Sequence, residues 1–190
     1  MILPNIENFI GCDSSFEEAE IVLYGAPFDS TTSFRPGARF GPSAIRHESF
    51  GLETYSPYQD RDLMDIHVFD SGDLELCFGS SEKALADIQD HAEEILKSGK
   101  MPLLLGGEHL VTLAAVRAAA ERYPGLHVIH FDAHADLRDD YLGARLSHAC
   151  YPQMLRYSWR WTDTSVLYSK WGKRRIPVCK GAYRFSSLYF

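Results

Sequence analysis

Short apolar runs that stop at glycine or proline alternate along this chain with longer amphipathic stretches, and this alternation constrains the fold most. The first run covers residues 21–24 and stops at Gly25, and similar runs lie near residues 66–70, 101–105 and 126–131. Continuous apolar strands are typical of a parallel sheet that is covered on both faces. Strands that alternate with helices therefore predict an α/β domain with a mostly parallel sheet, whose ligands gather at the carboxyl ends of the strands.

The stretches between these runs predict helices. Between Ser81 and Gly99 the apolar residues follow the i, i+3, i+4, i+7 spacing, which predicts a helix that Ser81 caps and Gly99 closes. An alanine-rich helix is predicted to end before Pro124, and a short helix is predicted to begin at Pro42 and to run towards Glu48.

Composition and charge limit the classes of protein to which this chain can belong. A chain of 190 residues that is 45% hydrophobic can form one substantial core, so we expect one domain. The formal net charge of -7 argues against a nucleic-acid partner and suits a small cationic substrate. Since no apolar run approaches the roughly 20 residues of a membrane span and the opening lacks a basic secretory start, we expect no membrane partner and a cytoplasmic location. The four cysteines form no CxxC pair and are interpreted as buried free thiols: Cys12, Cys77, Cys150 and Cys179.

The charge is not evenly distributed along the chain. Residues 151–190 hold eight lysines and arginines against a single acid, Asp163, so the first 150 residues carry all of the net negative charge. This basic, aromatic tail shows neither strand alternation nor a capped amphipathic helix. We therefore predict a domain over residues 1–150 and a separate tail over residues 151–190.

Ionisable residues are concentrated where the fourth apolar run ends, in "HVIHFDAHADLRDD". His130, Asp132, His134 and Asp136 share one parity and hence one face of an extended chain. An unpaired buried carboxylate costs several kcal/mol, so a metal ion is expected to neutralise the row. His109, in "GGEH" at the end of the preceding run, can face the last three of these side chains. Mixed nitrogen and oxygen ligands suit Mn, Fe, Co or Zn better than Ca or Mg.

A family resemblance is carried by "GGEH", "DAHAD" and "SHA", together with "GAPFDSTTSFRPGARFGPSAIR". Over about Phe9 to Cys150 the chain resembles the ureohydrolase family of arginases and agmatinases, most of all the agmatinases. The resemblance implies a three-layer α/β/α sandwich of the arginase type. It also implies two Mn²⁺ ions, a metal-activated hydroxide that attacks a guanidinium carbon to release urea, and a homo-oligomer in the intact family.

The resemblance implies roles for five residues. His109 and Asp136 resemble ligands of one metal, His134 resembles a ligand of the other, and Asp132 resembles the carboxylate that bridges them. His148, in "LSHAC", resembles the histidine that transfers a proton to the leaving amine, a task that suits a titrating imidazole.

Other residues near the motifs receive weaker interpretations. His127 and His130 match no ligand position and are interpreted as structural. Glu108 is either a partner that orients His109 or only an acid at the end of a strand. The arginines of the long signature are interpreted as surface or subunit-interface residues: Arg35, Arg39 and Arg46.

The substrate is expected to be a small cationic guanidino compound. Arginases bind the α-amino and α-carboxyl groups of arginine with Asn and Ser residues, but the corresponding loop here, "LRDDYLGARL", has neither. Asp139 and Asp140 suit a bare ammonium group, which favours agmatine, with putrescine and urea as products. Other guanidino or formimino hydrolases of the family remain open: arginase, guanidinobutyrase and formimidoylglutamase.

One motif of the family is missing. The later SxDxDxxDP motif, whose two aspartates complete both metal sites, does not occur, and residues 151–190 resemble no family segment. We interpret the chain as the N-terminal half of the fold with a tail from a shifted reading frame. Asp132 and Asp136 supply about two negative charges, enough for one divalent ion at most. An inactive metal-binding fragment is therefore the second hypothesis, beside an active hydrolase.

Overall fold

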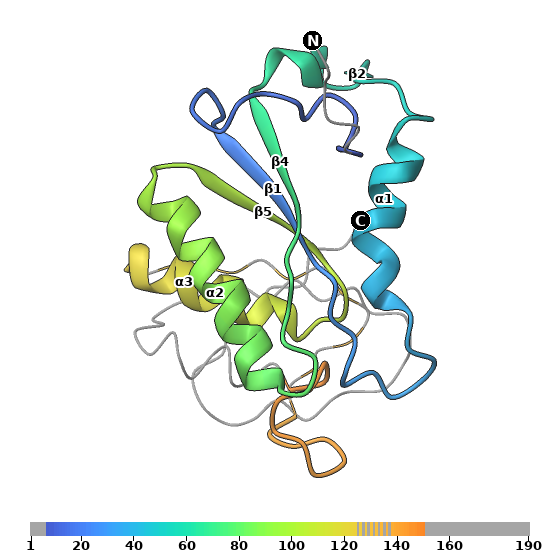
Figure 1. Cartoon of the computed structure of the whole chain (residues 1–190), viewed down its shortest axis with the longest axis vertical. Coiled ribbons are helices and arrows are strands. Elements are labelled where there is room, and N and C mark those ends of the chain that lie inside the picture. The colour runs from blue at the N-terminus through green and yellow to red at the C-terminus, as the bar shows by residue number, and fades with distance from the viewer. Residues whose placement is uncertain are drawn as a thin grey trace.

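The computed structural model describes residues 7–124, the even-numbered residues from 126 to 136, and residues 138–150. Its centre is a three-stranded parallel sheet in the order β4-β1-β5, formed by β4 (Val68–Asp73), β1 (Ile21–Ala26) and β5 (Met101–Gly106) (Figure 1). In register, Ile21 lies opposite Val68 on one side and Met101 on the other. The predicted parallel sheet is confirmed for these three strands.

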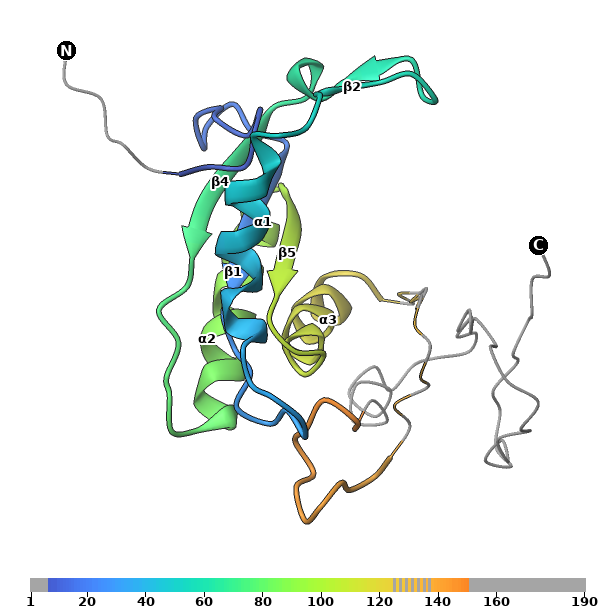
Figure 2. The ribbon, with the colours of Figure 1, turned by 90° about the vertical axis from the view of Figure 1, so that its right-hand side faces the viewer.

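Helices cover both faces of this sheet. α1 (Gly41–Ser49) lies on one face, and α2 (Ser81–Lys97) and α3 (Val111–Arg122) lie on the other (Figures 1 and 2). The loop after α1 carries a small antiparallel pair, β2 (Tyr55–Ser56) and β3 (Arg61–Asp62), and two short 3-10 helices, η1 (Ala38–Phe40) and η2 (Leu63–Asp65), flank this region. The result is the expected α/β/α arrangement.

Strand alternation divides the core between the two faces. Val22, Tyr24 and Ala26 are buried against α2 and α3, whereas Leu23 packs with Cys12 and Val68 on the α1 side. The predicted apolar stripe of α2 is entirely buried: Ala84, Leu85, Ile88, Ala92, Ile95 and Leu96. The apolar stripe of the helix, which has a period of 3.6 residues, thus packs on the alternate residues that the strand presents on one face of the sheet.

Two details of the predicted elements differ in the structure. The cap of α2 is Ser80, whose hydroxyl accepts a hydrogen bond from the Lys83 N–H at 3.2 Å, and not Ser81, which is the first helical residue. The predicted fourth strand is not confirmed: its described residues, Leu126, Val128 and His130, lie outside any strand, and the residues between them lie outside the described part. The predicted tail, residues 151–190, also lies outside it.

The thiols follow the sequence interpretation where the structure describes them. Cys12 and Cys150 are buried and Cys77 is half-buried, and all three are free. Burial raises the pKa of Cys12 to about 11, so this thiol is protonated and inert at neutral pH. Among the helices of the described residues, none is long and apolar enough to cross a membrane.

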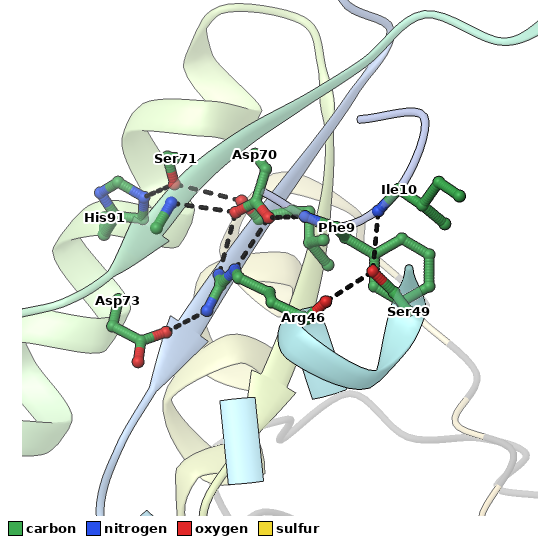
Figure 3. Close-up of polar contacts among 10 residues, drawn as sticks. Phe9, Ile10, Arg46, Ser49, Asp70, Ser71, Asp73 and His91 are labelled. Atoms are coloured by element: carbon green, nitrogen blue, oxygen red, sulfur yellow. Dashed lines mark hydrogen bonds and ion pairs between the residues drawn. The ribbon is translucent and has the colours of Figure 1, made fainter. Parts of the chain in front are cut away.

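Arg46 occupies the interface between α1 and β4, and the prediction of a surface or subunit-interface role for it is wrong. Its side chain is 4% exposed. The guanidinium binds both carboxylate oxygens of Asp70, at 2.8 and 2.9 Å, and also pairs with Asp73 (Figure 3). Asp70 in turn accepts the N–H of Phe9 at 2.9 Å. One arginine therefore connects the helix, the edge strand and the N-terminal segment.

The other two arginines of the signature are closer to the surface. Arg39 is 46% exposed at its side chain and pairs with Asp29, which is fully buried and also accepts the backbone N–H of Gly37 at 2.7 Å. Arg35 adopts a φ of 50° and lies over the ring of Phe34 at 5.2 Å. Asp29 therefore stabilises the loop that contains this signature through contacts within the loop itself. The sequence did not indicate this structural role.

Gly107 brings the chain after β5 against the chain after β1. A Cβ atom at this position would lie 2.0 Å from the carbonyl oxygen of Phe28, and the N–H of Gly107 donates to the Ala26 carbonyl at 3.0 Å. Only a residue without a side chain allows the two backbones to approach this closely. The two loops therefore lie in direct backbone contact beside the candidate site.

We expect Gly107→Ala to lower the free energy of unfolding by about 1–3 kcal/mol or more, because backbone atoms must move to admit the methyl group. Urea unfolding of the full chain, followed by circular dichroism, measures this. Gly51→Ala is the matched control, since its Cβ would lie at an ordinary 3.4 Å from the Glu48 carbonyl. Equal losses in both variants would show that the contact with Phe28 is not the cause.

Candidate active site

The candidate site lies at the carboxyl ends of β1 and β5. The loop after β1 carries Thr31 and Ser33, and the turn after β5 carries Glu108 and His109 immediately before α3. The N–H of Glu108 donates to the Phe28 carbonyl at 2.8 Å, which fixes the β5 turn against the β1 loop. This is the edge at which the parallel sheet was expected to collect ligands.

His109 and Asp136, which were predicted to bind the same metal, lie in direct contact. The Nδ1 atom of His109 lies 2.7 Å from Oδ2 of Asp136, and the two side chains are 20% and 17% exposed. Asp136 has a φ of 46°, a left-handed conformation that aspartate adopts more readily than most residues. Residues 27 positions apart are thus brought into direct contact.

Asp132 lies among imidazoles. Its Oδ1 accepts the backbone N–H of His134 at 2.8 Å and lies 3.6 Å from Nδ1 of the same histidine, while its Oδ2 lies 3.4 Å from Nε2 of His130. Burial raises the pKa of the Asp132 carboxyl, but the His134 N–H and the His130 imidazole outweigh it, so the pKa lies below its usual value. The carboxylate is therefore ionised at neutral pH and available as a ligand.

The donor atoms of His109, His130 and Asp132 form one group, all lying within 4.8 Å of one another. The rings of His109 and His130 are stacked, with centroids 5.0 Å apart. Sequence reasoning left His130 as structural, although its parity with Asp132 was a signal that could have included it. His134 is 80% exposed and contacts the group through Asp132, and His127 lies outside the described residues.

This donor set fits a divalent transition-metal ion. Two imidazoles and a carboxylate in mutual reach, with Asp136 against His109, offer the mixed nitrogen and oxygen ligands that Mn, Fe, Co and Zn accept. The four predicted ligands therefore lie in one neighbourhood. Their individual roles stay predictions.

His148 is held by the loop after β1. Its Nδ1 lies 2.7 Å from the carbonyl oxygen of Thr31, and its backbone N–H donates to the Thr31 hydroxyl at 3.1 Å. Its Nε2 lies 3.5 Å from Oγ of Ser33, and the ring packs edge-on against Tyr141 at 5.5 Å. The predicted shuttle histidine is thus an ordered residue with defined partners.

Glu108 is buried, with 6% of its surface exposed. Its Oε1 accepts both the hydroxyl and the backbone N–H of Thr31, whereas Oε2 has no hydrogen-bond partner among the described residues. Burial raises the pKa of Glu108, although the hydrogen bonds from Thr31 and the nearby His148 act in the opposite direction. That Glu108 orients His109 stays a prediction. Sequence reasoning missed its contact with Thr31, because a threonine in a loop carries no motif.

Asp139 and Asp140, the predicted ammonium ligands, are exposed in the loop between the metal motif and His148. Asp140 accepts the N–H of Gly143 at 3.0 Å, which is an ordinary turn interaction. Their position on this loop is compatible with substrate binding, and their role stays a prediction.

Comparison with known proteins agrees with this fold. A family model described as the arginase family matches residues 19–170. The match runs past Cys150, so it includes part of the segment that the sequence analysis assigned to an unmatched tail. The boundary at residue 150 therefore stays a prediction.

The similar proteins include agmatinases. An agmatinase of Bacillus subtilis is 52% identical over 141 residues, which cover 74% of this chain and 49% of that protein. A putative agmatinase structure from Clostridium difficile superposes with a TM-score of 0.74 at 42% identity, covering 82% of this chain and 58% of the other. Proclavaminate amidino hydrolase from Streptomyces clavuligerus superposes with a TM-score of 0.80 at 28% identity, covering 97% and 64%.

The fold defines an α/β protein with an arginase-like parallel sheet, and the chain carries a group of two imidazoles and a carboxylate that could hold a metal ion. The chain belongs to the arginase family. It spans about half the length of the curated relatives that it matches.

Proposed function

We propose that this chain carries the first half of a guanidino hydrolase site, and that the site acts on agmatine to give putrescine and urea. The observation that carries the proposal is the convergence of His109, Asp132 and Asp136 at one sheet edge. The identity of 52% to an agmatinase supports agmatine over other guanidino substrates. The small cationic substrate and the homo-oligomer expected of the family are part of this proposal.

In the proposed site, His109, Asp132, His134 and Asp136 hold the divalent cation, with Mn²⁺ as the first choice. A bound divalent cation supplies a Lewis acid that lowers the pKa of water, which hydrolysis of a stable guanidinium requires. Asp132 and Asp136 supply the negative charge that a cationic centre and substrate need. His148 delivers a proton to the leaving amine, and the acids at positions 139 and 140 bind the distal ammonium of agmatine.

Urea release separates this function from its alternatives. We expect the full chain alone, with Mn²⁺, to bind metal and to release little urea, since two aspartates balance only one ion. A hybrid in which residues 1–150 are joined to the complementary half of the Bacillus subtilis agmatinase is expected to release urea from agmatine. The same hybrid with His109→Ala is the control and should release none. A hybrid that binds Mn²⁺ but never releases urea would favour the inactive metal-binding fragment.

The substrate is tested with the same hybrid and a panel of agmatine, arginine, 4-guanidinobutyrate and formiminoglutamate. We expect agmatine to give the highest kcat/KM. The Asp139→Asn, Asp140→Asn double variant should raise KM for agmatine by about tenfold, with kcat little changed. The reason is that it removes the interaction between the two carboxylates and the ammonium group of the substrate, which contributes about one to two kcal/mol to binding. Preference for arginine or formiminoglutamate would overturn the assignment of agmatine.

A further inference from the structure

We propose that Glu108 and Thr31 are positioning residues that hold the imidazole of His148 as its Nδ1–H tautomer, leaving Nε2 as the atom that exchanges the proton. The inference rests on the proposed function, in which His148 transfers a proton, and goes beyond it by naming the atom and the residues that select it.

The tautomer follows from the contact with Thr31. A backbone carbonyl can only accept a hydrogen bond, so the ring nitrogen that lies 2.7 Å from the Thr31 oxygen must carry the hydrogen. That nitrogen is Nδ1. In the neutral ring the other nitrogen, Nε2, then has the lone pair, and it becomes the site at which a proton is gained and lost.

Thr31 is itself fixed from two sides. The Thr31 hydroxyl donates its single hydrogen to Oε1 of Glu108. A lone pair of the Thr31 hydroxyl oxygen is then left to accept the backbone N–H of His148, at 3.1 Å. The Thr31 N–H also donates to Oε1 of Glu108, at 3.2 Å. Both donors of Thr31 are thus tied to one carboxylate. The Thr31 carbonyl shares a peptide plane with the N–H of Thr32, which donates to the Asp29 carbonyl at 3.4 Å, so these contacts together restrain the orientation of the carbonyl.

Glu108 suits this task because it cannot easily move. It is buried, and the adjacent backbone is anchored by its own N–H on the Phe28 carbonyl and by the Gly107 contact. A buried carboxylate is costly to keep, and within the described residues both of the hydrogen bonds that the Glu108 carboxylate accepts come from Thr31. Glu108 and His109 are neighbours, so one turn supports both the shuttle histidine and a metal ligand.

Nuclear magnetic resonance of the full, metal-free chain tests the tautomer directly. Long-range ¹H–¹⁵N correlation at a pH of about 8, above the ordinary imidazole pKa of about 6.5, distinguishes the two neutral tautomers. His148→Gln identifies the His148 signal among the eight histidines by its loss. We expect the Nδ1–H form to exceed the Nε2–H form by about tenfold, the ratio that one net hydrogen bond supports.

Matched variants test the positioning. Thr31→Val and Glu108→Leu remove one partner each and should lower this tautomer ratio by roughly fivefold or more. Thr31→Ser and Glu108→Gln keep the hydroxyl and an acceptor oxygen, and should restore it. Thr32→Val is the control, because the Thr32 hydroxyl donates to the Asp29 carbonyl instead.

The inference is overturned if the wild-type chain holds His148 mainly as the Nε2–H form. It is also overturned if Thr31→Val and Glu108→Leu leave the ratio within about twofold of wild type, or if Thr32→Val lowers it equally. If either Thr31→Val or Glu108→Leu does not fold, the remaining one still tests the inference, by comparison of its tautomer ratio with that of Thr31→Ser or Glu108→Gln at the same position. Urea release plays no part in this readout, so a fixed tautomer together with a hybrid that releases no urea would contradict the proposed function alone.

Discussion

Replacing Arg46 with methionine is expected to lower the free energy of unfolding of the chain by about 3–5 kcal/mol, because it leaves the buried carboxylate of Asp70 without its cation. The Asp70 side chain is fully buried, and both of its oxygens bind the Arg46 guanidinium. Asp73 would lose the same partner. Since small domains have about 5–15 kcal/mol of net stability, this loss would remove between a fifth and all of it.

Urea unfolding of the full chain measures the effect of Arg46→Met, with the thermal transition as a second readout. Lys97→Ala is the matched control: Lys97 also pairs with an acid, Glu93, but it is 74% exposed, and we expect a much smaller loss than for Arg46→Met. The double variant Arg46→Met, Asp70→Leu should recover part of the stability, because it removes the unpaired charge as well. A loss below about 1 kcal/mol for Arg46→Met would refute the buried pair.

Metal binding should depend on His109 more than on any exposed histidine. His109 belongs to the group of donor atoms and also contacts Asp136, so its removal affects both aspartates of the site. We expect His109→Ala to weaken Mn²⁺ binding by more than about 100-fold, since loss of an outer partner alone costs about 10- to 100-fold. Isothermal titration calorimetry of the full chain gives both the affinity and the number of ions bound.

His47→Ala is the control for that experiment, because His47 is 71% exposed and pairs with Glu7. The wild-type chain should bind one Mn²⁺, as the charge of Asp132 and Asp136 predicts. His130→Gln is the informative comparison: a loss as large as that of His109→Ala would make His130 a ligand, as its place in the donor group suggests. Unchanged affinity in His109→Ala would rule out this metal site.

The sequence predicted the repeating elements well, because their physics is local. The stripe of α2 and the apolar run of β1 each carry their own periodicity, and both are found where expected. The cap was misplaced by one residue because Ser80 and Ser81 are chemically equivalent until the backbone decides which hydroxyl can reach Lys83.

The errors and omissions arose where contacts are long-range. Nothing local in the sequence distinguishes Arg46 from Arg39, and only the parallel pairing of β1 and β4 brings Asp70 beneath α1. Thr31 and Glu108 lie 77 positions apart, so their hydrogen bond has no sequence signal. The candidate metal motif, by contrast, was visible in the sequence because Asp132, His134 and Asp136 lie close together along the chain and share one parity.

The backbone contact between Phe28 and Gly107 has a consequence for how this protein can change over time. It links the β1 loop, which holds His148, to the β5 turn, which supplies His109. A substitution that displaces one of these loops also displaces the other, because their backbones are in direct contact. Amino-acid substitutions that alter substrate preference are therefore expected mostly in the outer 138–145 segment. Substitutions in the two inner loops are expected to occur together, as compensating pairs.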